Sequence, residues 1–286
     1  MNELFLERMR EMLKDEFPAY LEKLNDPARK GLRINTLKIT PDDFFACTNY
    51  ELEKSPFAKN GYYANIKSGV GFTPEHMAGF FYIQEPSASS AVTILDPKPG
   101  MKVLDMCAAP GSKSTQISEM LEQEGLLVAN EIHPTRSRIL LENIERCGSA
   151  NTIVLNNDPK DISKAFPEFF DMVLCDAPCS GEGMFRKEDQ AVEQWSLENV
   201  QACALRQSYI LEEAYKCLKP GGTMVYSTCT FAMEENEMCM IKFMQEHPDM
   251  HLVPIEVDFG RKAFDLGSHT DYARRIFPMD GGEGHF

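Results

Sequence analysis

The chain has 286 residues, 43% of them hydrophobic, and a formal net charge of -15 at pH 7. This length can bury a sizeable core in one large or two smaller domains, as in a soluble globular protein. No apolar run reaches the roughly 20 residues that span a bilayer, and the N-terminus is too charged for a signal peptide, so we expect a cytoplasmic protein without membrane contact. The net negative charge taken alone argues against nucleic-acid binding, which depends on neutralising phosphates.

Cysteine usage predicts reduced thiols rather than a disulfide frame. The 9 cysteines are an odd number, show no paired zinc-type spacing and lie mostly in apolar segments. Cys175 and Cys179 are four apart without a second pair or a nearby His, so we expect no metal site. Most of the nine are explained as small core residues.

The first part of the chain, residues 1–75, predicts a small α+β domain. Apolar residues recur at helical spacing within residues 1–25, which predicts one or two helices. The segment "GLRINTLKITPDDF" alternates apolar and polar residues and then breaks at Pro41, which predicts a short strand and a helix start. Residues 51–79 follow an irregular pattern rich in Gly, Pro and Tyr.

The second part, residues 76–286, predicts a doubly wound, mostly parallel α/β sheet, because nearly all-apolar strands alternate with helices. The strand-like runs are 102–106, 126–131, 152–157, 170–178 and 223–230. The helical stretches are 112–122, 135–147, 197–218 and 233–247. Ligands bind such sheets beyond the carboxyl ends of the strands, so candidate site residues are sought there.

A loop rich in small residues follows the first of these strands. Its members are Cys107, Ala108, Ala109, Pro110, Gly111, Ser112 and Lys113. Small side chains let backbone amides approach a ligand, and the helix N-terminus that follows favours a carboxylate or phosphate. A plain tight turn between strand and helix is the alternative. The G-x-G-x-x-G pattern is absent and Ser112, not Gly, precedes Lys113, which argues against a nucleotide kinase.

Acidic residues close the next two strands. Glu131 lies where a carboxylate grips the two hydroxyls of a ribose in dinucleotide-binding folds. Asp158 follows the third strand, where its carboxylate could accept a hydrogen bond from an adenine amino group. Either one alone could equally be a surface carboxylate. Together with the small-residue loop they predict a nucleoside site.

The fourth and fifth strands each end in a cysteine, within "DAPCSG" and "STCT". If these strands are neighbours, their axes lie about 4.8 Å apart, so Cys179 and Cys229 could face one pocket together with Asp176. For each cysteine alone, a buried apolar role is about as well supported. The residues themselves do not say which thiol would attack a substrate.

These motifs resemble, in order and spacing, the RNA cytosine-5 methyltransferases of the RsmB, RsmF and NSUN type. The resemblance rests on "LRINTLK", "YIQEPSASS", "DMCAAPGSKS", "NEIHPTRSRILLENIERCG", "NTIVLNND", "FDMVLCDAPCSGEGMFRK" and "LKPGGTMVYSTCTF". It covers about residues 30–286 and is closest to the bacterial branch that modifies small-subunit (16S) ribosomal RNA. Relatives of that branch carry a further C-terminal RNA-binding region, which we expect this chain to lack.

The resemblance implies a Rossmann-like methyltransferase domain that uses S-adenosyl-L-methionine. The small-residue loop, Glu131, Asp158 and Asp176 would hold this cofactor. Cys229 would add to C6 of cytosine, and Cys179 would assist release of the methylated base. Asp176 would also hydrogen-bond the pyrimidine edge, donating toward N3 if it is protonated. Lys113 is a candidate for favouring the thiolate.

The same resemblance predicts RNA as the partner and a monomeric protein, with a target base that is flipped out or lies in a loop. The expected phosphate contacts come from the N-terminal domain and the segment after Cys179. They are Lys30, Arg33, Lys38, Arg186 and Lys187. Solvated surface charge is the alternative for each cluster.

Three rival functions stay open at this point. The first is the same cytosine-5 methylation on transfer RNA, because catalytic motifs describe the reaction and not the RNA. The second is a non-catalytic RNA-binding or assembly factor that kept the fold. The third is a small-molecule or protein methyltransferase, which leaves the second thiol without a task.

Overall fold

The computed structural model describes residues 1–66 and 69–286, and packing divides the chain into two units made of non-consecutive segments. The first unit comprises Met1–Arg29, Pro178–Tyr209 and Thr228–Phe286. The second unit comprises Lys30–Ala177 and Ile210–Ser227. These are packing units, and the functional division at residue 75 stays a prediction.

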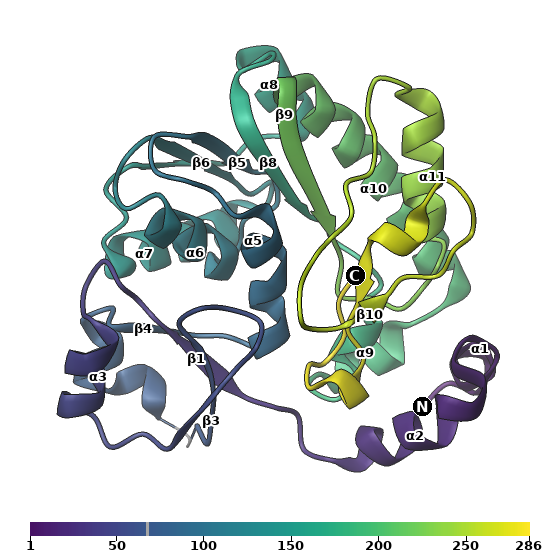
Figure 1. Cartoon of the computed structure of the whole chain (residues 1–286), viewed down its shortest axis with the longest axis horizontal. Helices are drawn as coiled ribbons and strands as arrows, with labels where there is room; N and C mark the ends of the chain where they lie inside the picture. Colours follow the sequence, from purple (N-terminus) through teal and green to yellow (C-terminus); the bar gives the residue numbers. More distant parts are fainter. Residues whose placement is uncertain (67–68) are drawn as a thin grey trace. The chain divides into compact units, whose positions relative to one another are not determined.

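The second unit contains a parallel sheet of five strands in the order β7-β6-β5-β8-β9 (Figure 1). The strands are β5 (Lys102–Asp105), β6 (Leu126–Asn130), β7 (Thr152–Leu155), β8 (Phe170–Asp176) and β9 (Leu218–Ser227). The chain runs outwards from β5 to β6 and β7 and then crosses to β8 and β9, so the strand order reverses between β5 and β8. The predicted doubly wound α/β fold is confirmed, and the reversal marks the edge where such folds bind ligands.

Helices of the second unit cover the sheet. They are α5 (Ser90–Leu95), α6 (Ser112–Met120), α7 (Pro134–Cys147) and α8 (Pro159–Ala165), with the end of α10 (Leu197–Cys217). Side chains of α5 and α6 share one core cluster with Val103, Leu127 and Leu174, and α7 lies along the same face (Figure 1). Residues 103, 127 and 174 point to this face because side chains alternate along a strand.

A four-stranded antiparallel sheet in the order β2-β3-β1-β4 also belongs to the second unit. Its strands are β1 (Gly31–Ile34), β2 (Leu52–Lys54), β3 (Gly61–Ala64) and β4 (Phe81–Ile83), accompanied by α3 (Pro41–Cys47) and α4 (Pro74–Met77). The strand and helix start expected around Pro41 are confirmed. The irregular pattern of residues 51–79 did not reveal β2 and β3, because their residues form no apolar run. Residues 67–68 lie outside the described residues.

The first unit is built from short elements around an aromatic core. Its elements are α1 (Glu3–Leu13), α2 (Phe17–Asn25), α9 (Asp189–Gln194), α11 (Glu237–Glu246), β10 (Arg261–Lys262) and β11 (Arg274–Arg275), with the start of α10. Short 3₁₀ helices occupy Lys14–Glu16, Val70–Phe72, Pro86–Ser89, Glu182–Met184, Thr270–Tyr272 and Pro278–Asp280 of the whole chain.

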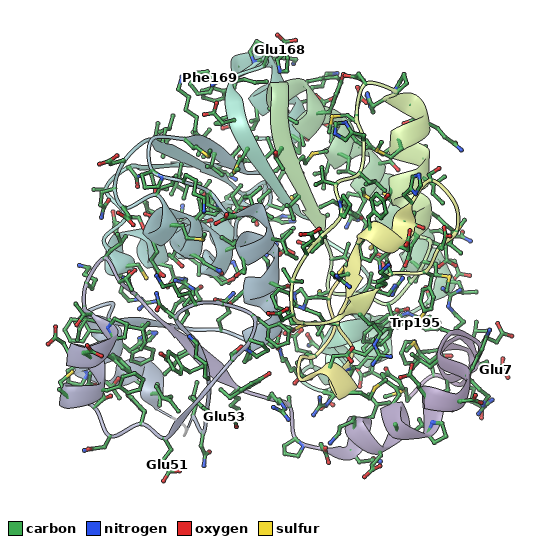
Figure 2. The ribbon with its side chains drawn as sticks, viewed as in Figure 1. Glu7, Glu51, Glu53, Glu168, Phe169 and Trp195 are labelled. Atoms are coloured by element: carbon green, nitrogen blue, oxygen red, sulfur yellow. The ribbon has the colours of Figure 1, made fainter. Side chains whose placement is uncertain are left out.

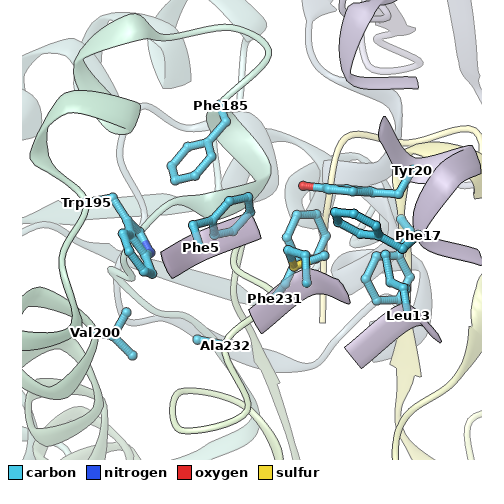
Figure 3. Packing of buried hydrophobic residues seen from close by; sticks show 11 residues of the cluster. Phe5, Leu13, Phe17, Tyr20, Phe185, Trp195, Val200, Phe231 and Ala232 are labelled. Atoms are coloured by element: carbon cyan, nitrogen blue, oxygen red, sulfur yellow. The ribbon is translucent and has the colours of Figure 1, made fainter. Parts of the chain in front are cut away.

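The core of the first unit joins α1 to residues almost two hundred positions later (Figure 3). The Phe5 ring packs edge-on against Phe185 and Trp195, with ring centroids 4.8 and 5.6 Å apart. The Trp195 indole N–H donates to the Glu182 carboxylate at 2.8 Å. Such aromatic contacts anchor α1, which buries Phe5, Met9 and Leu13.

Acidic side chains account for the surface charge of both units. Glu7 in the first unit and Glu51, Glu53 and Glu168 in the second are exposed, whereas Trp195 is buried (Figure 2). Over the described ranges, no helix is both long and apolar enough to cross a membrane.

Replacing Phe5 by Ala tests the packing of α1. We expect the free energy of unfolding to fall by about 3–5 kcal/mol. We also expect emission from Trp195, the single tryptophan, to shift to the red as water reaches the vacated space. Denaturant titration followed by tryptophan fluorescence measures both. Glu7→Ala, at an exposed position of the same helix, is the control, and an unchanged midpoint and spectrum for Phe5→Ala would contradict the packing described.

Candidate functional site

The loop after β5 has a fixed backbone path. The Ala108 N–H donates to Asn130 O, and Gly111 N–H donates to Ala108 O, both at 2.8 Å. Gly111 has φ +111°, and a Cβ there would also lie 3.2 Å from Leu140 Cδ1. Glycine therefore suits this position on both conformational and steric grounds. The turn leads directly into α6, whose first-turn amides have no partner within the helix and form an anion-binding end.

The two acidic residues expected on β6 and β7 follow neighbouring strands. Glu131 comes directly after β6, is buried, and accepts a hydrogen bond from His133 N–H at 2.9 Å. Asp158 lies three residues beyond β7 and caps α8 by accepting from Lys160 N–H at 2.9 Å. The capping role of Asp158 was not predicted, although the Pro that follows it is typical of a helix start. A carboxylate can accept several hydrogen bonds, so these contacts leave room for a ligand. The ligand contacts of Glu131 and Asp158 stay predictions.

Asp176 ends β8 and is held by two donors. Its Oδ2 lies 2.7 Å from Lys113 Nζ, and its Oδ1 accepts from the Ser227 hydroxyl at 2.8 Å. The Lys113 side chain is 9% exposed, so water screens this ion pair little. A cation at this distance favours the ionised carboxylate, which accepts hydrogen bonds and donates none. The sequence suggested that Lys113 favours the thiolate of a cysteine. In the structure Lys113 forms an ion pair with Asp176, which belongs to the same unit.

Asp105, the last residue of β5, is fully buried and interacts electrostatically with Asp176 and Lys113. Burial raises the pKa of Asp105 from 3.8 to about 7. The hydrogen bond from Ser114 Oγ, at 2.6 Å, lowers this pKa, whereas the negative charge of Asp176 raises it further. Sequence reasoning did not select Asp105. The signal for it was an acidic residue inside an otherwise apolar strand.

The two thiols expected at neighbouring strand ends are in contact within the first unit. Cys179 Sγ and Cys229 Sγ lie 3.2 Å apart. The residues that follow them are also joined, because the Ser180 and Thr230 hydroxyl oxygens lie 2.8 Å apart. Cys179 follows β8 by three residues and Cys229 follows β9 by two, since β9 ends at Ser227 and not at residue 230 as expected.

Gly183 allows the two cysteine segments to approach so closely. Its N–H donates to the Cys229 carbonyl at 2.9 Å. A Cβ at Gly183 would lie 2.8 Å from Gly284 O and 3.0 Å from Cys229 O, too close for any other residue without a backbone shift. This requirement was not visible in the sequence, where "SGEG" reads as an ordinary turn.

The two sulfurs are not equivalent. The hydrogen bond with Cys229 and then burial raise the pKa of Cys179 well above 9.0, and the negative charge of Glu235 adds to the rise. The S–H of either cysteine can donate across this contact, and the raised pKa favours the protonated form of Cys179.

For two of the five basic residues, the predicted contact with RNA is wrong. Arg33 is 1% exposed and forms an ion pair with Glu119, also donating to Ser112 O and Thr115 Oγ1 at 3.1 and 2.8 Å. It therefore ties β1 to the first turn of α6 and cannot reach a phosphate.

The Arg186 side chain is 5% exposed, pairs with Glu283 at 3.2 Å and donates to the backbone oxygens of Asp26 and Pro27. It is equally unable to reach RNA. Lys30, Lys38 and Lys187 are exposed, and their RNA contacts stay predictions.

All nine cysteines are free thiols. Within residues 1–66 and 69–286, no three His, Cys, Asp or Glu side chains form a group that could hold a metal ion.

The chain matches family models along most of its length. A model described as 16S rRNA methyltransferase RsmB/F matches residues 92–286, and a model for the N-terminal domain of 16S rRNA methyltransferase RsmF matches residues 1–86.

Among known proteins, the chain is 39% identical to ribosomal RNA small subunit methyltransferase F of Erwinia tasmaniensis, over 97% of this chain and 61% of that protein. It is 40% identical to the Escherichia coli K12 protein of the same name, over 86% of this chain and 53% of the relative. The chain thus spans between half and two thirds of the length of these relatives.

Among solved structures, a methyltransferase homolog protein from Pyrococcus horikoshii has a TM-score of 0.88 and 30% identity, covering 100% of this chain and 93% of that one.

The pKa of Asp105 predicts how stability depends on pH. Between pH 4 and 7 the folded chain holds a proton on Asp105 that the unfolded chain has released, so the free energy of unfolding falls as pH rises through this window. The amide introduced by Asp105→Asn cannot ionise. We expect the stability of this variant, relative to the original chain, to rise by about 4 kcal/mol from pH 4 to pH 7 and then to level off. Urea titrations at several pH values measure this difference, and parallel curves would contradict the assignment.

The sulfur contact predicts a disulfide under mild oxidation. Diamide would take one hydrogen from each thiol and become the hydrazine while the S–S bond forms at about 2.05 Å. We expect a cross-linked peptide containing Cys179 and Cys229, detected by mass spectrometry after alkylation. Cys47, exposed on α3, is the control and should stay alkylatable. Alkylation of both Cys179 and Cys229 after diamide treatment would contradict the contact.

Proposed function

Because the chain belongs to the 16S rRNA methyltransferase RsmB/F family, we propose that it methylates C5 of a cytosine in small-subunit ribosomal RNA, with S-adenosyl-L-methionine as methyl donor. The observation that carries the proposal is the 3.2 Å contact between the sulfurs of Cys179 and Cys229. Ribosomal RNA as substrate implies action in the cytoplasm.

Methylation of cytosine C5 requires a thiol nucleophile and a second group that assists release, and two adjacent thiols can fill these roles. C5 is a poor nucleophile until a thiolate adds to C6, which turns the ring into an enamine-like nucleophile. The methyl group then bonds to C5. In the release step the departing Cys229 sulfur takes the proton of Cys179, and the Cys179 thiolate left behind accepts the C5 proton, whose electron pair re-forms the C5–C6 double bond. One thiol attacks, and a second group must assist this release.

We assign attack to Cys229 and release to Cys179. The raised pKa of Cys179 supports this assignment, since a group that keeps its proton is a poor nucleophile. The 3.2 Å contact also places the S–H of Cys179 where it can give its proton to the Cys229 sulfur as that sulfur leaves C6.

Asp176 is proposed to bind the cytosine edge. Its ion pair with Lys113 favours a carboxylate, so we expect it to accept a hydrogen bond from the amino group of cytosine rather than to donate to N3. Cys179 follows Asp176 by three positions, and Cys229 follows Ser227 by two. Extended chain covers at most about 3.6 Å per residue, so the Cα atom of each cysteine lies within about 11 Å of the Cα atom of its strand end.

The residues after β5, β6 and β7 fit a nucleoside that carries an amino acid. The small side chains of Cys107–Lys113, the left-handed Gly111 and the helix end beyond it would accept the carboxylate part of S-adenosylmethionine. Glu131 would hold the ribose and Asp158 the adenine. When bound, the cofactor supplies an electrophilic methyl group.

RNA contacts are proposed for the exposed lysines Lys30, Lys38 and Lys187. A base stacked within a helix cannot enter a protein site, so the target cytosine must be flipped out or lie in a loop. Methylation assays with small ribosomal subunits and with transfer RNA distinguish the proposed substrate from the same reaction on tRNA.

A denaturing gel with RNA and S-adenosylmethionine tests the roles of the thiols. Cys179→Ala should accumulate a covalent RNA adduct because release fails, whereas Cys229→Ala should form none. Cys47→Ser, at an exposed thiol on α3, is the control and should turn over normally. Adduct with Cys229→Ala but not with Cys179→Ala would reverse the assignment.

A further inference from the structure

A buried carboxylate holds the segment that carries Cys179. Glu235 is 0% exposed, and its Oε2 accepts from the Ser180 backbone N–H at 3.0 Å and from Gln207 Nε2 at 2.8 Å. The same amide nitrogen of Gln207 donates to the Pro178 carbonyl at 3.0 Å. The residues on both sides of Cys179 are therefore anchored to Glu235, one directly and one through Gln207.

We propose that Glu235 and Gln207 are positioning residues that hold Cys179 in the geometry for release of the methylated base. The proposal rests on the proposed function. An amide NH₂ has two hydrogens, and Gln207 uses one for each acceptor, so its side chain has a single orientation. Gln207 is itself 0% exposed and lies on α10, which makes it a rigid support for the loop.

Burying a carboxylate such as Glu235 costs free energy, and hydrogen bonds from the Cys179 segment offset that cost. Burial raises the pKa of Glu235, and hydrogen bonds from Ser180 and Gln207 oppose this rise. A carboxylate away from water is stable only when donors surround it, and here the donors come from the Cys179 segment and its support. The Ser180–Thr230 contact extends the connection to the residue after Cys229.

The position of Glu235 suits release better than attack. Its hydrogen bonds reach the backbone around Cys179, and its charge raises the pKa of Cys179. Loosening the segment should therefore displace the Cys179 thiol and lower its proton affinity, while the nucleophile on the other segment remains. The expected defect is slow release with normal adduct formation.

The test compares four variants by adduct formation in the first turnover, steady-state turnover and melting temperature. Glu235→Ala and Gln207→Met should form adduct within about twofold of the original rate but turn over on the order of 10- to 100-fold more slowly, so that adduct accumulates. Glu235→Gln should recover most of the turnover, because its carbonyl oxygen can accept both hydrogen bonds. Glu234→Ala is the matched control, since this neighbouring residue pairs with Arg8 instead.

Equal losses of adduct formation and turnover, or normal turnover in both Glu235→Ala and Gln207→Met, would overturn the proposal. If Glu235→Ala does not fold, Gln207→Met decides. Failure of Cys179→Ala to accumulate adduct would instead refute the proposed roles of the thiols, so the two failures can be told apart.

Discussion

The parallel pairing of β8 with β9 is the constraint on which the candidate site depends. Asp176 pairs with Ser227 as the last residue of each strand, and their side chains share a hydrogen bond. The segments that carry the two thiols therefore begin at paired residues. A shift of one residue in this register would turn the β9 side chains to the opposite face and change the relative lengths of the two segments.

Charged side chains inside the protein fix the ends of the strands. Lys113 holds Asp176 at the end of β8, and Arg33 pairs with Glu119 near the end of α6 while donating to Ser112 O at its start. Glu235 holds the Cys179 segment. Buried ion pairs of this kind add little net stability but are costly to break, so they favour one geometry over its alternatives. In a chain with net charge -15, these cations serve the site's architecture rather than its surface.

Local patterns predicted the frame of the molecule well. The five strands stand out because each lies in a mostly apolar run of sequence, and strands β5–β8 begin at the predicted residue. The residues of β2 and β3 form no such apolar run, and the seven-residue helix α8 was not predicted. β9 begins at Leu218, five residues before the prediction, because its first residues include Pro220 and Gly221, which normally argue against a strand.

Residues of the candidate site could be predicted only where they follow the end of a strand that the sequence reveals. Cys179 and Cys229 follow strands that could be recognised, so their contact could be inferred. Arg33 and Arg186 were misjudged because their partners lie 86 and 97 positions away in the chain, at Glu119 and Glu283. Glu235 and Gln207 were missed for the same reason, since only the folded chain brings them to Cys179.

The central claim is that the protein uses the thiols of Cys179 and Cys229 to methylate C5 of a cytosine in small-subunit ribosomal RNA. Bisulfite sequencing of ribosomal RNA from cells with the protein, without it, and with Cys229→Ala tests this most directly. The account predicts one or more cytosines that resist conversion only when the unaltered protein is present. Identical conversion in all three samples, or protection that persists with Cys229→Ala, would contradict it.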